Sequence, residues 1–306
     1  MLMSLLTEVR RRLAIVGIAL CATGDAPAQA VAVAPPQPRE DIAYAEVLRL
    51  PVEGPPVRVA YGPDPLQYGE LWSPSTQAAG WPAAAGRPAA PLVVMVHGGC
   101  WLNAYGVDHT RPMAAALSRA GFAVWSLEYR RTGDAGGGWP GTLEDIRRAL
   151  DALPQLVAPP LAARVVDLRR VAVVGHSAGG HLALLAARGR SDVRTVVGLA
   201  AIVDPATYGQ GDNSCQRAVP RFMGGSAAEF PERYRLADAA AVPPRTSTTL
   251  LHGAVDVIVP VSQARLPGAT VEIVPGAGHF DWLHPDTPAF ARLRELLRAQ
   301  LSPATP

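Results

Sequence analysis

After residue 90 the chain alternates between uninterrupted apolar stretches and stretches whose apolar residues recur at helical spacing. The uninterrupted stretches are typical of strands buried on both faces of a sheet, and they span residues 91–96, 122–127, 171–174, 195–203, 248–251 and 270–274. The helical patterns lie between and after them, at residues 111–120, 143–153, 180–187 and 288–301. This order predicts an α/β fold with a mostly parallel twisted sheet and helices on both faces.

Two parts of the chain depart from this alternation. Ahead of it, apolar and polar positions alternate at residues 44–50, 57–61 and 67–72, which predicts antiparallel edge strands with one face on a core. Between two buried strands, residues 204–245 form a polar segment longer than a crossover requires, so we expect a lid or cap there. Only a short helix is expected at residues 261–268.

The N-terminus has the layout of a secretory signal. Arginines at 10–12 precede an apolar run at 13–22, and the small residues Ala28 and Ala30 on either side of Gln29 suit a signal peptidase. The run has roughly ten residues, about half of what a membrane span needs. We therefore expect export to the periplasm or the medium after removal of residues 1–30, with no membrane span in the mature chain.

Three other interpretations of this segment stay open: an N-terminal helix without a targeting role, a twin-arginine signal on Arg11 and Arg12, and a lipoprotein site at Cys21. Beyond it, residues 31–43 are rich in Ala, Pro and Gln and predict a flexible leader. Residues 44–306 are expected to form the α/β domain.

Composition and charge narrow the possible partners. Hydrophobic residues make up 49% of the chain and charged residues 18%, which suits a globular protein with a large core. The 28 basic and 26 acidic residues carry both signs throughout and leave a formal net charge of +2. Nucleic-acid binding is disfavoured, because it needs a concentrated basic surface.

The most informative motif is Gly-His-Ser-Ala-Gly at residues 175–179. It follows a predicted strand and opens a predicted helix, which is the setting of a nucleophile elbow. The two glycines allow a sharp turn and a close approach of strand and helix, so that Ser177 presents its hydroxyl above the sheet edge.

An acid and a histidine follow Ser177 in the order that such an elbow requires. Asp256 lies just beyond one apolar strand, and His279 lies in a glycine-rich loop beyond the next. His279 is expected to take the proton from Ser177, while Asp256 orients the imidazole and stabilises its positive form. Asp204, directly after the strand at 195–203, is the alternative acid.

A glycine-rich loop after the strand at 91–96 supplies the remaining part of the site. Its residues His97, Gly98, Gly99 and Cys100 let the backbone bend so that amides point at the oxygen that becomes negative. We expect an oxyanion hole made by the amides of Gly99, Cys100 and Ala178, with Gly98 shaping the bend and His97 holding the loop by hydrogen bonds.

The HGGCW sequence at 97–101 and the GHSAGGH sequence at 175–181 resemble those of the hormone-sensitive-lipase-like esterases and of the kynurenine formamidase (arylformamidase) branch of the α/β-hydrolase fold. The resemblance covers about residue 91 to the C-terminus. It implies a hydrolase of carboxylic esters, aryl formamides or acyl sugars that needs no metal and no cofactor. Cys100 stands where lipase-like esterases usually have a third glycine, and together with Trp101 it favours the formamidase-like side.

Further side chains are expected around the same sheet edge, where α/β folds bind ligands. The aromatic candidates for a substrate pocket are Trp101, Tyr105, Trp139, Phe222, Phe280 and Trp282. Cys100 and Cys215 are expected to form a disulfide in an oxidising compartment, joining the loop to the lid-like segment. The remaining histidines lack metal-ligand spacing, so no metal site is predicted.

The sequence favours a serine hydrolase that cleaves carboxylic esters of small or medium acyl or aryl groups through an acyl-enzyme on Ser177. Its expected partner is a small-molecule ester or amide. Arylformamidase-like amide hydrolysis is the nearest alternative, and a prolyl-oligopeptidase-type peptidase is disfavoured because no propeller-sized domain precedes the catalytic part. A non-enzymatic α/β-hydrolase used for binding is the alternative from a different class.

Overall fold

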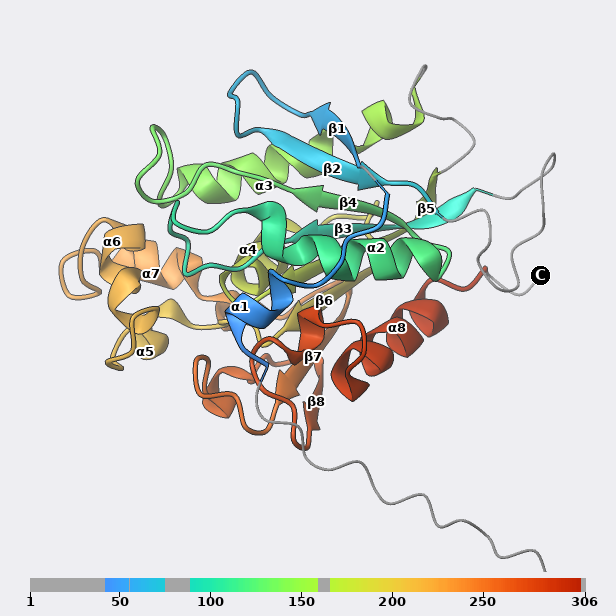
Figure 1. Cartoon of the computed structure of the whole chain (residues 1–306). Helices are drawn as coiled ribbons and strands as arrows, with labels where there is room; N and C mark the ends of the chain where they lie inside the picture. The colour runs from blue at the N-terminus through green and yellow to red at the C-terminus, as the bar shows by residue number, and fades with distance from the viewer. Residues whose placement is uncertain (1–41, 55, 75–88, 159–165, 304–306) are drawn as a thin grey trace, which may run out of the picture. The chain divides into compact units, whose positions relative to one another are not determined.

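A single mixed sheet organises the chain in the computed structural model, which describes residues 42–54, 56–74, 89–158 and 166–303. Eight strands follow the order β1-β2-β4-β3-β5-β6-β7-β8 (Figure 1). The strands are β1 (Val57–Ala60), β2 (Tyr68–Trp72), β3 (Ala90–Val96), β4 (Ala123–Leu127), β5 (Val166–His176), β6 (Thr195–Leu199), β7 (Ser247–Gly253) and β8 (Thr270–Val274). β1 and β2 are antiparallel to their neighbours and the remaining pairs are parallel, which confirms the predicted α/β architecture.

The helices lie on both faces of this sheet. The α-helices are α1 (Tyr44–Val47), α2 (Arg111–Arg119), α3 (Gly141–Asp151), α4 (Ala178–Ala186), α5 (Pro205–Tyr208), α6 (Val219–Met223), α7 (Pro231–Ala237) and α8 (Pro288–Gln300). Short 3₁₀ helices are η1 (Val107–Thr110), η2 (Leu153–Val157), η3 (Gln216–Ala218), η4 (Ala239–Ala241), η5 (Val261–Gln263) and η6 (Asp281–Leu283). The predicted signal segment 1–30 lies outside the described residues, as does the leader up to residue 41.

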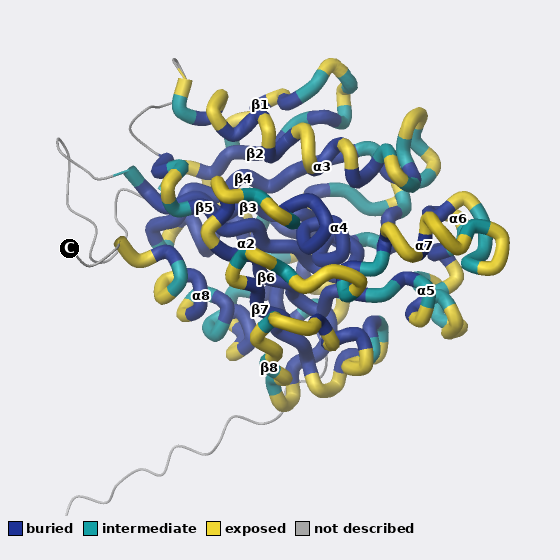
Figure 2. The backbone as a smooth tube through the Cα atoms, turned by 180° about the vertical axis from the view of Figure 1, so that it is seen from behind, coloured by how far each residue is buried: buried dark blue, intermediate teal, exposed yellow. Residues whose placement is uncertain are grey.

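The core is divided by the sheet into two apolar layers. All seven residues of β3 are buried, as a strand covered on both faces requires. Side chains of α3 and α4 fill one layer and those of α2 and α8 fill the other. Figure 2 shows the central strands buried and the outer loops exposed.

The strand expected at residues 44–50 is wrong, because the structure forms the helical turn α1 there. Tyr44 and Val47 are three residues apart, so one turn of helix places them on the same side. Val47 is fully buried in the core layer of α2 and α8. Burial of Val47 therefore fixes the segment as a turn, while β1 pairs only with β2 at this edge of the sheet.

The segment at 204–245 connects β6 to β7 and contains α5, α6 and α7, which Figure 1 shows grouped as a lobe at one side of the sheet. Phe222 and Met223 anchor the lobe in the core layer of α3 and α4. The lobe is therefore part of the same hydrophobic core rather than a separate unit.

The carboxyl ends of the parallel strands meet at one edge. Paired positions at these ends include Val96 with Gly175, His176 with Leu199, Leu199 with Leu251, and Gly253 with Val274. Residues that directly follow these strands are therefore brought together, although they lie far apart in the sequence.

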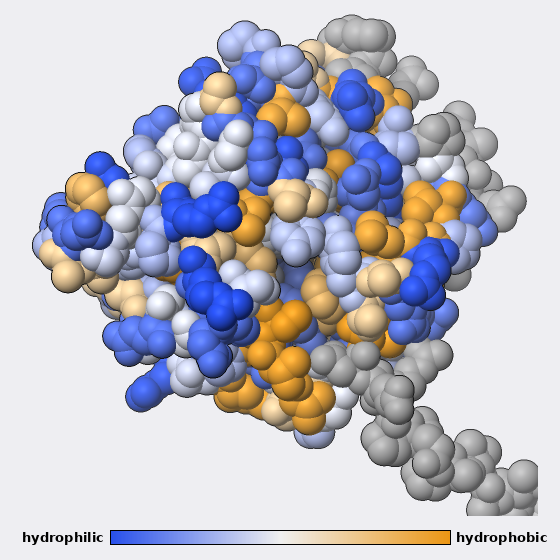
Figure 3. Space-filling view, turned by 60° about the vertical axis from the view of Figure 1, so that its left-hand side comes forward, coloured by the Kyte–Doolittle hydropathy of each residue, from blue (hydrophilic) through white to orange (hydrophobic). Residues whose placement is uncertain are grey.

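The surface mixes apolar and polar side chains. On the face seen in Figure 3, hydrophobic residues lie in several patches among hydrophilic ones, and the most extended patch runs toward the lower edge of the view. Among the residues that the structure describes, no helix has the length and apolarity to cross a bilayer.

A buried carboxylate ties α3 to the edge of the sheet, and its removal should destabilise the fold. Asp145 is fully buried and accepts hydrogen bonds from the Gln67 amide at 2.7 Å and from the Arg130 guanidinium at 2.6 and 2.9 Å. Asp145→Ala leaves these donors without an acceptor, so we expect a loss of about 3 kcal/mol in the free energy of unfolding. Urea denaturation monitored by circular dichroism measures this loss.

The matched control is Asp151→Ala on the same helix. The Asp151 carboxylate is largely exposed and pairs with Arg190 at 2.6 Å, so its loss should cost no more than about 0.5 kcal/mol. Equal effects of the two variants would contradict the assignment of Asp145 as a buried anchor.

Candidate active site

Ser177 occupies a strained turn between β5 and α4. Its backbone dihedral angles are φ 55° and ψ −121°, a region that residues with a side chain rarely adopt. The Ser177 amide donates to the Leu199 carbonyl at 2.9 Å, which holds the turn against the end of β6. The geometry is that of a nucleophile elbow, with the serine at the carboxyl edge of the sheet.

Glycines make this turn possible because three backbone segments meet there. A Cβ at Gly179 would overlap the carbonyl oxygens of Val96 and His97, and a Cβ at Gly175 would overlap the Gly179 carbonyl. The ends of β3 and β5 and the first turn of α4 are therefore in direct backbone contact. The predicted close approach of strand and helix is present at this motif.

His279 and Asp256 form a buried pair beside Ser177. His279 Nδ1 lies 2.8 Å from Asp256 Oδ2, and the other carboxylate oxygen accepts from the amides of Ile258 and Val259, both at 2.8 Å. Burial by itself raises the pKa of Asp256, but the hydrogen bond and charge of His279 and the two amides lower it overall. The carboxylate is therefore ionised, and it leaves His279 Nε2 as the ring nitrogen available to a nucleophile.

The alternative acid does not take part in this pair. Asp204 caps the N-terminus of α5, where its side chain accepts from the Ala206 and Thr207 amides and from the Thr207 hydroxyl. The carboxylate that contacts His279 is that of Asp256, so Asp204 is a helix cap.

The loop after β3 has an unusual backbone. Gly99, Cys100 and Trp101 follow one another with φ angles of 111°, 53° and 58°. In the part of the chain that the structure describes, the amides of Gly99, Cys100 and Ala178 have no hydrogen-bond acceptor. Gly99 and Cys100 line the same cavity as Ser177. The oxyanion-hole role expected for these amides stays a prediction.

The structure joins Cys100 to Cys215 by a disulfide, the pairing expected from the sequence. The bond connects the loop after β3 to the lobe between β6 and β7, and both cysteines line the cavity. The two residues are separated by 115 positions, so the crosslink closes a long loop of the chain.

The cavity at Ser177 has a volume of about 250 Å³. Its wall consists of Tyr44, Gly99, Cys100, Tyr105, His109, His176, Ser177, Asn213, Ser214, Cys215, Ile258, His279 and Phe280. The lobe supplies Asn213 to Cys215, so the segment expected to be a lid contributes a wall of this cavity. Aromatic rings from α1, η1 and the loops, which contact one another around Tyr44, also line it.

Of the aromatic candidates for substrate contact, Tyr105 and Phe280 line the cavity and four others do not. Trp101 stacks on Phe222 with ring centroids 4.7 Å apart, and both are buried in the layer of α3 and α4. Trp139 packs edge-on against Phe222, and Trp282 is buried in the layer of α2 and α8. The side chains of Trp101, Phe222 and Trp282 are buried in the core and that of Trp139 is partly buried against it, so the structure does not place these four at the cavity, contrary to the prediction.

Several cavity residues were not predicted as site residues. Tyr44 comes from the turn α1, which the alternating pattern had suggested to be a strand. His109 lies in η1 with no local motif around it, and its pKa is lowered to about 3, chiefly by burial and then by the charge of His97. His176 belongs to the elbow motif, and its Nε2 donates to the His279 carbonyl at 2.9 Å. Tyr44 and His109 are single aromatic residues in short irregular segments, and no sequence motif marks either as a cavity residue.

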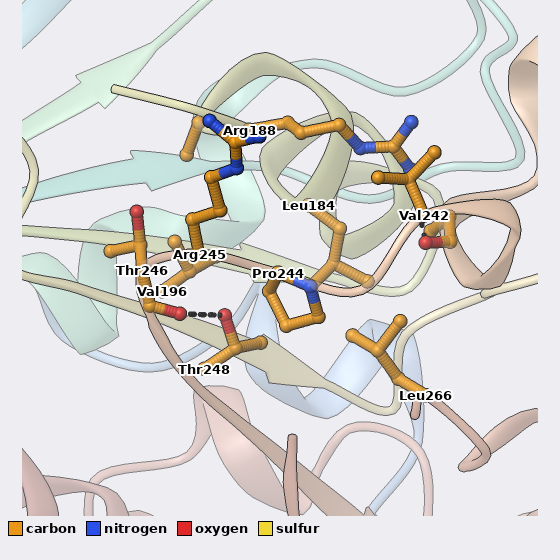
Figure 4. A pocket seen from close by; sticks show the side chains of 11 residues that line it. Leu184, Arg188, Val196, Val242, Pro244, Arg245, Thr246, Thr248 and Leu266 are labelled. Carbon is orange, nitrogen blue, oxygen red and sulfur yellow. Dashed lines mark hydrogen bonds between the residues drawn. The ribbon is translucent and has the colours of Figure 1, made fainter. Parts of the chain in front are cut away.

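A second hollow lies between α4 and the segment leading into β7 (Figure 4). Leu184, Pro244 and Leu266 line it, and its volume is only about 10 Å³. A single water needs roughly 10 to 15 Å³, so this hollow is too small for a substrate. Within residues 42–54, 56–74, 89–158 and 166–303 there is no group of three or more His, Cys, Asp or Glu side chains placed to hold a metal ion.

Comparison with known proteins finds one matching family and similar proteins named as ester hydrolases. The family model described as BD-FAE matches residues 81–267. Esterase LipC of Mycobacterium tuberculosis is 27% identical over 258 residues, covering 74% of this chain and 60% of LipC. The probable carboxylic ester hydrolase LipM of the same organism is 27% identical over 202 residues, covering 58% of this chain and 43% of LipM. The chain thus spans about half the length of the curated relatives it matches.

Solved structures agree on the fold. Esterase B of Lactobacillus rhamnosus superposes with a TM-score of 0.63 at 22% identity, covering 79% of this chain and 83% of that protein. This similarity, together with the strand order, makes the architecture an α/β-hydrolase fold of the kind found in esterases.

The disulfide should contribute measurably to stability. Because Cys100 and Cys215 close a long loop, Cys215→Ser is expected to lower the free energy of unfolding by roughly 2 to 4 kcal/mol. Dithiothreitol should lower the free energy of unfolding of the wild type to about that of the variant, and it should leave the stability of the variant unchanged. Thermal unfolding with and without the reductant measures both effects, and a wild type that is insensitive to reduction would argue against the crosslink.

Proposed function

The chain belongs to the BD-FAE family, and on this basis we propose that it is a serine hydrolase that cleaves carboxylic esters of small or medium acyl or aryl groups. The observation that carries the proposal is the shared cavity of Ser177 and His279, with Asp256 bonded to the far side of the imidazole. An activated serine needs this arrangement, because a neutral hydroxyl is a weak nucleophile. The ester hydrolase names of LipC and LipM support the same chemistry.

In the proposed reaction the Ser177 oxygen forms a bond to the acyl carbon while its proton passes to His279 Nε2. The carbonyl electron pair moves onto oxygen, and the amides of Gly99, Cys100 and Ala178 stabilise the resulting charge. Collapse of this tetrahedral intermediate breaks the ester bond, and the departing alkoxide takes the proton from His279. Water then repeats the sequence on the acyl-enzyme and releases the carboxylic acid.

The size of the cavity limits the acyl or alcohol group that fits beside Ser177. About 250 Å³ lies just below the usual range of pockets that enclose drug-sized ligands, roughly 300 to 1,000 Å³. Its wall includes aromatic rings and the polar side chains of Asn213 and Ser214. We therefore propose a small or medium substrate with an apolar or aryl part and a polar part.

A second candidate is arylformamidase-like hydrolysis of an N-formyl aryl amide. The sequence observation that favours it is the HGGCW stretch at 97–101, which resembles the kynurenine formamidase branch more than the lipase-like esterases. A formyl group is the smallest acyl group, and Tyr105 and Phe280 offer the aryl part of such a substrate rings to pack against.

We also propose that the chain is exported. The layout of residues 1–30 supports a signal segment, and the Cys100–Cys215 disulfide suits an oxidising compartment. N-terminal sequencing of the protein recovered from the periplasm or medium should begin at about Val31. Recovery of the intact N-terminus from the cytoplasm alone would contradict this proposal.

Replacement of the nucleophile tests the proposed function. Ser177→Ala should lower kcat for p-nitrophenyl acyl esters by at least about 10⁴-fold, because no other group can form the acyl-enzyme. A fluorophosphonate probe should label the wild type at Ser177 and leave the variant unlabelled. A panel that adds N-formyl anilides and proline p-nitroanilides separates the esterase, formamidase and peptidase alternatives, and a wild type that hydrolyses none of them and resists the probe indicates a binding protein.

The two acids provide a matched pair of variants for the same assay. Asp256→Asn should reduce kcat about 10⁴-fold, since the imidazole loses the partner that fixes its tautomer. Asp204→Asn should keep nearly full activity, because an asparagine also caps a helix. The reverse outcome would exchange the roles proposed for the two residues.

A further inference from the structure

Beneath the loop that follows β3 lies a buried cluster of polar groups that the proposed reaction does not use. We propose that His97 is a positioning residue held by Glu128 as a doubly protonated imidazolium, which fixes the Gly98–Gly99 peptide so that the Gly99 amide faces the cavity. The inference rests on the proposed function, because the amide matters only if an oxyanion forms at Ser177. It assigns to Glu128 and His97 a role in aiming that amide.

The surroundings of His97 Nδ1 can only accept a hydrogen. The Gly98 carbonyl oxygen lies 2.6 Å from Nδ1, and a carbonyl has no hydrogen to donate. The Tyr129 hydroxyl lies 3.4 Å from Nδ1, but its single hydrogen is donated to the His97 carbonyl at 2.6 Å. Both neighbours therefore require that Nδ1 carries a hydrogen.

The other ring nitrogen also faces an acceptor. His97 Nε2 lies 3.0 Å from Glu128 Oε1, which also lies 3.0 Å from the Tyr129 amide and from the Arg131 guanidinium. The second carboxylate oxygen accepts from the Val107 amide at 3.1 Å. Because both oxygens already accept hydrogen bonds, the Glu128 carboxyl group is ionised and has no hydrogen to donate. The hydrogen between His97 Nε2 and Glu128 Oε1 must therefore be on Nε2.

Glu128 is ionised in this cluster, because the amides of Val107 and Tyr129 donate to its oxygens and the Arg131 guanidinium pairs with it. Burial alone raises the pKa of Glu128, but the charge and hydrogen bond of His97, then the charge of Arg131, lower it to about 2. An ionised Glu128 accepts at both oxygens. The fully buried imidazole of His97, which lies between a carboxylate and a carbonyl oxygen, is then doubly protonated. Its positive charge is balanced by the ion pair with Glu128.

The charges that face His97 from every neighbouring element nearly cancel. Glu128 and Arg131 come from the segment after β4, and Arg131 also pairs with Asp134 at 3.3 Å. His109 of η1 lies with its ring centroid 5.6 Å from that of His97, and burial keeps it neutral. Burial likewise lowers the pKa of His176 at the end of β5, with His279 as the next cause. The positive charges are thus those of His97 and Arg131, matched by Glu128 and Asp134.

The consequence for the reaction follows from the geometry of a peptide group. The Gly98–Gly99 peptide is trans, since the one cis bond in the described chain precedes Pro140. In a planar trans peptide the C=O and N–H bonds point in opposite directions. Because the Gly98 carbonyl is drawn toward His97, the Gly99 N–H points away from it, and Gly99 lines the cavity at Ser177. The cationic donor also polarises this peptide and strengthens the amide as a donor.

The protonation state can be observed without any substrate. The chain has seven histidines, and ring-¹⁵N-labelled full-length protein at pH 8 should show one of them with hydrogens on both nitrogens. An ordinary histidine, with a pKa of about 6.5, is neutral at that pH. The signal should vanish in His97→Gln. Neutral tautomers for all histidines would overturn the proposal, and this outcome is independent of whether the protein is an esterase.

Two neutral replacements separate positioning from simple packing. Asn places a donor near the position of Nδ1 and Gln places one near Nε2, so His97→Asn can keep the bond to Gly98 while His97→Gln cannot. We expect His97→Gln to lower kcat for a p-nitrophenyl ester about 10- to 100-fold with little change in KM, since a misaimed oxyanion donor acts on the transition state. The loss in kcat should be clearly smaller for His97→Asn. Equal losses, or losses confined to KM, would overturn the positioning role.

Glu128→Gln tests the partner of the pair. It should abolish the doubly protonated signal and lower kcat with little change in KM, and persistence of the signal would contradict the role of Glu128. The buried His284, which lies outside the cluster, provides the control His284→Gln with unchanged kcat. Thermal unfolding of each variant identifies misfolding, and the ring-nitrogen spectrum of the wild type decides the question if a variant fails to fold.

Discussion

The contact between the backbone of Gly179 and the carbonyls of Val96 and His97 is the constraint on which the rest of the site depends. It brings the backbone at the end of β3, the end of β5 and the first turn of α4 into direct contact. Only there can the free amide of Ala178 and those of the loop after β3 lie beside the same hydroxyl. A side chain at residue 179 would overlap these carbonyls, so the glycine is what lets the two halves of the proposed site meet.

The fold and the proposed reacting residues could be predicted from sequence for one physical reason. In a parallel sheet all carboxyl ends share an edge, so a residue that directly follows an apolar stretch is placed at that edge before any contact is known. Ser177, Asp256 and His279 each follow such a stretch, and the order of the chain distinguishes their proposed roles. The sequence alone does not distinguish Asp204 from Asp256, because both lie at the same edge and only the hydrogen bond to His279 tells them apart.

The aromatic pocket was predicted poorly because position along the chain does not fix the direction of a side chain. Trp101 follows Cys100 in the loop, yet its indole stacks on the buried Phe222 and does not line the cavity. Tyr44 reaches the cavity because burial of Val47 folds its segment into a turn. In both cases a neighbour's packing decides the outcome, and that packing depends on residues distant in sequence, which no local pattern contains.

The loop between His97 and Trp101 shows how strain at a functional site is maintained. Two residues with side chains, Cys100 and Trp101, hold positive φ angles, a conformation that costs on the order of 1 kcal/mol or more at each. The disulfide to Cys215 fixes the far end of the loop to the lobe, and the His97–Glu128 pair fixes the near end to the segment after β4. Because both restraints come from outside the loop, its free amides need no partners of their own. In the proposed reaction these amides bind the oxygen that becomes negative in the transition state.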